Sequence, residues 1–125
     1  MTNEVLLYTG SAVSIVWGVA HLAPTKPVVK GFGDISTENK RIITMEWLAE
    51  GFTLIFIGLL VALITALYDH SNAVSIFVYR VSAGMLVLMA ALTALTGART
   101  KIIPIRICPF IKISVAVLFI LGSVL

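Results

Sequence analysis

Residues 42–98 decide the fold of this chain. They read IITMEWLAEGFTLIFIGLLVALITALY (42–68), DHSN (69–72) and AVSIFVYRVSAGMLVLMAALTALTGA (73–98). The two outer runs are predominantly apolar, and each exceeds the roughly 20 residues that a helix needs to cross a bilayer core. Because only the short polar stretch at 69–72 separates them, the sequence predicts an antiparallel hairpin of two membrane-spanning helices.

Two further apolar runs flank this hairpin. The first, at about 5–23, contains no charged residue and is followed by Pro24, which stops a helix. The second lies at about 102–125, and two prolines near its beginning leave its first residue open. We therefore expect an all-α protein with a single domain over residues 1–125, a four-helix transmembrane bundle. Its spans are expected at about 5–23, 42–68, 73–98 and 102–125.

The composition points in the same direction. Hydrophobic residues make up 59% of the chain, and charged residues 12%, about half the roughly 25% of soluble domains. Mean hydropathy is +1.06. The single cysteine, Cys108, excludes an intramolecular disulfide. Too little polar sequence remains for a soluble enzyme domain or a nucleic-acid-binding domain, so nucleic acid is not an expected partner.

The basic residues gather in two connections between the spans. All lysines and arginines except Arg80 lie in the connection at 24–41 or after residue 98, if Lys112 is counted with the second group. Positive charge favours the cytoplasmic side, so we expect both connections to be cytoplasmic and both termini to lie on the non-cytoplasmic side. Membrane lipids, with anionic headgroups at these loops, are expected partners. We expect a multi-pass protein of a bacterial or archaeal cell membrane.

The connection at 24–41 also predicts where the second span begins. Ser36 or Thr37 is suited to cap a helix that continues to Tyr68. Such a helix would be roughly 48 Å long at 1.5 Å per residue. The bilayer core is only about 30 Å thick, so the first two turns are expected in the headgroup layer unless the helix tilts or bends.

Small residues predict the packing faces of two spans. In the first span they recur every four positions, at Gly10, Ser14 and Gly18. This spacing permits close approach of helices in lipid. In the third span, Gly84 and Ala91 lie on a mostly small-residue stripe headed by Arg80, and we expect that stripe to point into the bundle.

Glu50 and Arg80 carry charge inside the expected spans. Each residue is expected some way into the bilayer core from the opposite surface. Along the membrane normal, the distance left between them is below about 10 Å in a core about 30 Å thick. An unpaired charge inside the membrane costs several kcal/mol, so the sequence predicts a buried Glu50–Arg80 pair.

An alternative joins His21 to two carboxylates, Glu46 and Glu50, which share a helix face. These groups could handle protons or hold the polar head of a ligand, with Trp17 and Trp47 nearby. The competing interpretations are structural: an interfacial histidine, a glutamate at headgroup level, and tryptophans of the interfacial belt. No second histidine supports a metal site, and no metal is expected. No catalytic residue is assigned, because no nucleophile–histidine arrangement or phosphate-binding loop is visible.

Three segments carry a family resemblance. GVAHLAP (18–24), a loop with Phe32, and EWLAEG (46–51) followed by IGL (57–59) resemble DoxX-like four-helix membrane proteins. That family shows a small-residue first helix, a loop, and a second helix with an acidic residue, a glycine and a later Gly-Leu. Its members are linked to quinone-coupled sulfur oxidation or to membrane redox complexes. The resemblance therefore implies a membrane redox accessory protein or subunit.

Two functions of different classes follow as expectations. The first is a small integral membrane subunit or accessory protein that packs through its small-residue faces, as a homo-oligomer or within a larger complex. The second is a membrane-embedded enzyme or carrier for a lipophilic molecule, such as a quinone or an isoprenoid or sterol-like compound. In the second, His21, Glu46 and Glu50 would act at the polar head. The sequence requires no cofactor, and a quinone-like lipid is the candidate ligand.

Overall fold

The computed structural model describes residues 1–125, which are helical apart from short connections. Its elements are α1 (Thr2–Leu22), α2 (Thr25–Lys30), α3 (Thr37–Leu67), α4 (Ala73–Leu95), the short 3₁₀ helix η1 (Gly97–Arg99) and α5 (Ile103–Val124). Four of these helices are long and apolar enough to cross a membrane. The prediction of an all-α protein with four such helices is confirmed.

Capping residues set the limits of the central hairpin. The Ser36 hydroxyl accepts a hydrogen bond from the Asn39 backbone N–H at 3.1 Å, so α3 begins at Thr37 as the cap predicted. Its 31 residues give a length of roughly 46 Å. At the other end, Asn72 caps α4 by accepting from the Val74 N–H at 2.8 Å. The turn between these helices therefore occupies only 68–72.

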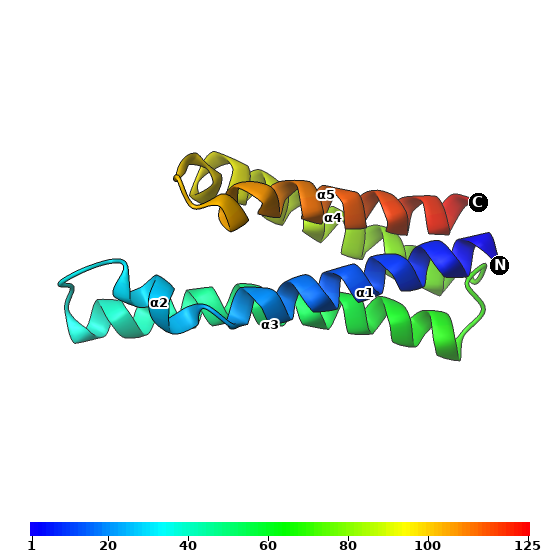
Figure 1. Cartoon of the computed structure of the whole chain (residues 1–125). Helices are drawn as coiled ribbons and strands as arrows, with labels where there is room; N and C mark the ends of the chain where they lie inside the picture. Colours follow the sequence, from blue (N-terminus) through cyan, green and yellow to red (C-terminus); the bar gives the residue numbers. More distant parts are fainter.

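The long helices associate as two pairs. α1 packs most extensively on α3, and α4 on α5, while α1 also contacts α5 and so joins the pairs. Contact between α3 and α4 is much sparser. The two pairs form separate layers, and the termini lie at the same end of the bundle as the turn between α3 and α4 (Figure 1). The short helix α2 lies beside the first turns of α3 (Figure 1).

Glycines allow α1 to approach its neighbours closely. A Cβ at Gly18 would lie 2.8 Å from the Gly51 carbonyl oxygen on α3, and one at Gly58 would lie 2.7 Å from the Ser11 carbonyl oxygen on α1. A Cβ at Gly10 would lie 2.7 Å from the Phe119 ring on α5. The small-residue row of α1 is therefore buried, and it serves both neighbouring helices rather than one.

The predicted packing stripe of α4 is wrong. Gly84, Ala91 and Arg80 are exposed, and a Cβ at Gly84 would have no neighbour within 4 Å. The buried face is the one that carries Tyr79, whose hydroxyl lies 3.1 Å from the Thr65 hydroxyl on α3. Apolar residues lie on every side of α4, so they do not by themselves define an inward face. The hydrogen-bond partners available to its few polar side chains help to select that face.

Candidate functional site

Each of the four long helices contributes one polar side chain to a single cluster. His21 comes from α1, Glu50 from α3, Thr93 from α4 and Lys112 from α5. We call these four residues the polar cluster. They are far apart in the sequence, so the cluster exists only when both helix pairs are assembled.

Lys112 lies at the centre of the polar cluster. Its side chain is completely buried, and its ammonium group donates hydrogen bonds to Glu50 Oε1 and, at 2.8 Å, to Thr93 Oγ1. The Thr93 hydroxyl in turn donates to the Met89 carbonyl oxygen at 2.9 Å, which leaves an oxygen lone pair for Lys112. The charge of Lys112 is thus balanced by one carboxylate and further stabilised by one hydroxyl.

His21 lies on the other side of the Glu50 carboxylate. Its Nε2 is 3.7 Å from Glu50 Oε2, which is longer than a hydrogen bond. Only 9% of the His21 side chain is exposed, and Nε2 is buried without a hydrogen-bond partner. Buried polar atoms are rarely left without a partner, so this nitrogen and the nearby Glu50 oxygen form an incomplete binding arrangement.

Trp47 fixes the position of His21. The two rings are stacked, with centroids 4.0 Å apart and an interplanar angle of 18°. The Trp47 indole N–H also donates to the His21 carbonyl oxygen at 2.8 Å. The last carbonyls of a helix lack partners within the helix, so this bond satisfies one of them at the end of α1. Trp47 is therefore a positioning residue for the cluster.

The polar cluster lies near one end of the stretch of α1 that is long and apolar enough to cross a membrane. His21 is 17 residues beyond Glu4, which corresponds to roughly 26 Å along α1 and so to a point inside a 30 Å core. α1 ends one residue after His21, at Leu22, whereas α3 begins at Thr37 and so continues for several turns on the N-terminal side of Glu50. The Glu50 side chain is 30% exposed while that of Lys112 is completely buried. Glu50 is therefore the more exposed member of the Glu50–Lys112 pair.

The predicted Glu50–Arg80 pair is wrong. Glu50 pairs with Lys112, and the exposed Arg80 donates from Nε to the Ser123 hydroxyl at 3.3 Å. Arg80 lies seven residues into α4, near the end of the bundle that carries the termini. Arg80 therefore donates its hydrogen bond at that end of the bundle, whereas Lys112 on α5 contacts Glu50 directly.

The other predicted site residues divide between the cluster and its surroundings. The structure brings His21 and Glu50 together, but Glu46 is exposed and makes no ion pair. Trp17 lies one turn before His21 and donates from its indole N–H to the Cys108 Sγ at 3.2 Å. This bond ties α1 to α5 beside the cluster without joining it.

Sequence reasoning missed Lys112 and Thr93. The charge of Lys112 suggests that it belongs with the basic connection, but its neighbours Ile111 and Ile113 indicate an apolar environment. A lysine within such a run needs a buried counter-charge, and Glu50 was available. Thr93 gave no comparable signal, because a single threonine is common in an apolar helix.

Neither a metal site nor a known relative identifies the chemistry of the polar cluster. No group of three histidine, cysteine, aspartate or glutamate side chains is arranged to hold a metal ion. Comparison of the chain with protein-family models, with curated proteins and with solved structures finds no match.

Proposed function

We propose that this chain is a multi-pass membrane protein that binds a lipophilic molecule by its polar head at the polar cluster. The observation that carries the proposal is the buried His21 Nε2, which has no hydrogen-bond partner and lies 3.7 Å from Oε2 of the half-buried Glu50. A purely structural ion pair would require only Glu50 and Lys112. Ionisable groups inside a membrane are costly, and they commonly mark a ligand or proton pathway.

The two atoms define the chemistry that the polar head must have. Glu50 Oε2 accepts hydrogen bonds, and the His21 Nε2 accepts or donates according to its tautomer. A hydroxyl whose oxygen lies to one side of the line joining these atoms would donate to Glu50 Oε2 and accept from a His21 Nε2–H. Lys112 pairs with the other oxygen of Glu50, which leaves Oε2 free to accept from a ligand. A hydroquinone ring, or the hydroxyl of an isoprenoid or sterol-like compound, meets these requirements, whereas a quinone carbonyl only accepts and could bond to a His21 Nε2–H alone.

The position of the cluster suits such a molecule. A polar head at this level lies near the boundary of the bilayer core, and the apolar tail then extends along the helices within the core. We infer that the side facing the basic ends of α3 and α5 is cytoplasmic, with both termini on the opposite side of a bacterial or archaeal cell membrane. The resemblance to DoxX-like proteins favours a quinone-like ligand and a role beside a redox complex.

Mass spectrometry of molecules that co-purify with the protein tests this proposal. The protein is purified in mild detergent and extracted with organic solvent, and the extract is compared with the lipids of the same membrane. We expect enrichment of one lipophilic molecule with a hydroxyl or carbonyl group. Glu50→Gln and His21→Phe should abolish this enrichment.

Glu46→Gln is the matched control for Glu50→Gln. It removes the same charge one helical turn away, from a side chain that is exposed and outside the cluster, so the enrichment should persist. Absence of any enriched molecule from the wild-type protein, or equal enrichment in all variants, would contradict the proposal.

A second candidate function is that of a subunit in a larger membrane assembly. It is favoured by the outward face of α4, where Gly84 and Ala91 are exposed and leave room for another helix. Small residues on a lipid-facing surface allow close helix contact. Gly84→Leu should then lower the mass of the detergent-solubilised assembly in light scattering, and an unchanged mass would argue against this candidate.

A further inference from the structure

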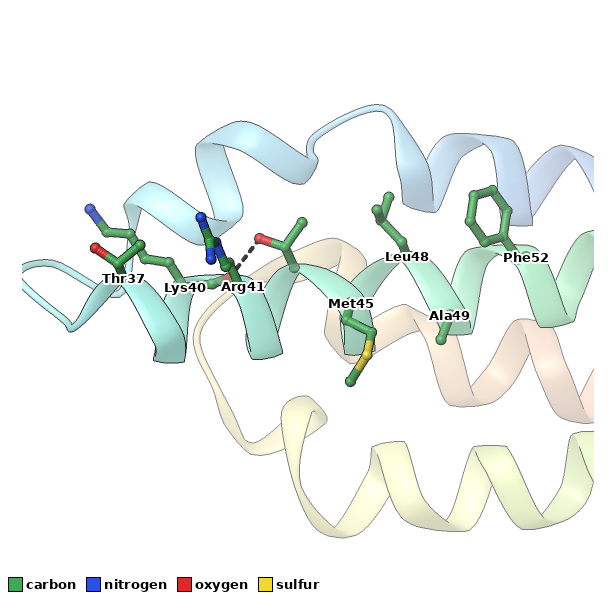
Figure 2. A pocket seen from close by; sticks show the side chains of 8 residues that line it. Thr37, Lys40, Arg41, Met45, Leu48, Ala49 and Phe52 are labelled. Carbon is green, nitrogen blue, oxygen red and sulfur yellow. Dashed lines mark hydrogen bonds between the residues drawn. The ribbon is translucent and has the colours of Figure 1, made fainter.

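The first half of α3 carries a groove on the face that points away from the polar cluster. Its volume is about 590 Å³, and all of its lining residues belong to α3, from Thr37 to Phe52. Figure 2 shows Lys40 and Arg41 toward the outer end of this groove, and Leu48 and Phe52 toward its inner end. Glu50 does not line it, so the groove is separate from the site proposed above.

The charges at the outer end of the groove have no counter-charge within the protein. Lys40 and Arg41 are exposed, and neither forms an ion pair with any other residue of the chain. Thr44 hydrogen-bonds to the Lys40 carbonyl oxygen at 2.7 Å, so its hydroxyl does not neutralise either cation. Two adjacent cations are therefore free to bind an anion.

The depth of the groove in the membrane identifies the kind of anion. Lys40 precedes Glu50 by ten residues, which places it roughly 15 Å further out along α3. The whole bilayer with its headgroups is about 40–45 Å thick, close to the length of α3, so Lys40 and Arg41 lie in the headgroup layer. The inner end of the groove then lies among the acyl chains.

We propose that this groove binds an anionic phospholipid. Its phosphate lies against Lys40 and Arg41, with the arginine fork hydrogen-bonded to two phosphate oxygens. The first part of an acyl chain lies over Met45, Leu48 and Phe52. A zwitterionic lipid fits less well, because its own ammonium group would lie close to the two protein cations. This proposal is independent of the lipophilic ligand at the polar cluster.

Lipid competition tests the proposal. The delipidated full chain is given equal amounts of phosphatidylglycerol and phosphatidylcholine with identical acyl chains, and the retained lipids are counted by native mass spectrometry. The wild-type protein should retain phosphatidylglycerol preferentially. A basic residue near an anionic headgroup accounts for roughly fivefold in affinity, so Lys40→Gln with Arg41→Gln should reduce the preference by about tenfold or more.

Arg99→Gln with Lys101→Gln is the matched control. It removes the same charge from the other basic connection, where both residues are exposed, and the preference for phosphatidylglycerol should persist. All four side chains are on the surface, so each variant should keep the wild-type melting temperature. The proposal is overturned if the wild-type protein shows no preference, if the groove variant retains it, or if the control variant is the one that loses it.

Discussion

Replacing Glu50 alone should destabilise the protein far more than replacing Glu50 and Lys112 together. Glu50→Gln keeps a hydrogen-bond acceptor but removes the charge that balances a completely buried ammonium group. Stranding one member of a buried pair costs about 3–5 kcal/mol. Neutralising an ordinary lysine at pH 7 costs about 4.6 kcal/mol, which sets an upper limit on this loss. We therefore expect Glu50→Gln to lower the free energy of unfolding by about 3–4 kcal/mol.

The reverse replacement should cost less. Lys112→Met strands a carboxylate whose side chain is 30% exposed, whereas Glu50→Gln strands an ammonium group that is completely buried. Its expected cost is about 1–2 kcal/mol, between the values for surface and buried pairs. The double variant has no stranded charge and should be about 2 kcal/mol more stable than Glu50→Gln alone.

Unfolding of the four proteins in mixed detergent micelles measures these differences. Glu46→Gln serves as the control for the loss of a carboxylate, and it should change the free energy of unfolding by less than about 0.5 kcal/mol. Single effects of Glu50→Gln and Lys112→Met that add to within about 0.5 kcal/mol in the double variant would refute the pairing.

Three further predictions concern packing, topology and the turn between α3 and α4. Gly18→Leu should lower the free energy of unfolding of the monomer by about 1–3 kcal/mol, because a Cβ there would lie 2.8 Å from a backbone oxygen of α3. Gly84→Leu is the control: the position has open space around it, so the free energy of unfolding should change by less than about 0.5 kcal/mol. A cysteine at Lys30 should react with an impermeant maleimide only from the cytoplasm and one at Ser71 only from outside, since the native cysteine is buried; reversed labelling would overturn the orientation. Hydrogen bonds from the backbone N–H and hydroxyl of Ser71 lower the pKa of Asp69, so they stabilise the turn above about pH 4 and this is lost as the pH falls through the lowered pKa. Ser71→Ala should raise the pKa of Asp69 in a carboxyl NMR titration, and an unchanged midpoint would contradict this account.

The fold was largely predictable because the length of an apolar run is a local property of the sequence. The turn before α4 and the Ser36 cap of α3 both appear where local signals placed them. The inward face of α4 was not predictable in this way. Its direction depends on partners such as Thr65 on α3, which interact with it only after the helices have packed.

The site was predictable only in part. His21 and Glu50 could be singled out because ionisable residues are rare inside a membrane. Their partners required the order of helices around the bundle. With α1 packed against both α3 and α5, Lys112 reaches Glu50, whereas Arg80 lies nearer the far end of the bundle. Depth along the helices alone could not distinguish these two cations.

The arrangement in two helix pairs has a consequence for membrane insertion. The pair α1–α3 and the pair α4–α5 occupy consecutive halves of the chain, so each can associate soon after it enters the bilayer. In the membrane topology proposed above, Glu50 and Lys112 would each lie in the bilayer without a counter-charge until the halves meet. The free energy of a half-assembled chain would therefore be raised by these unpaired charges, and correct docking of the two halves would lower it. In that topology the ion pair would favour correct docking of the two halves, because either half alone carries an uncompensated charge.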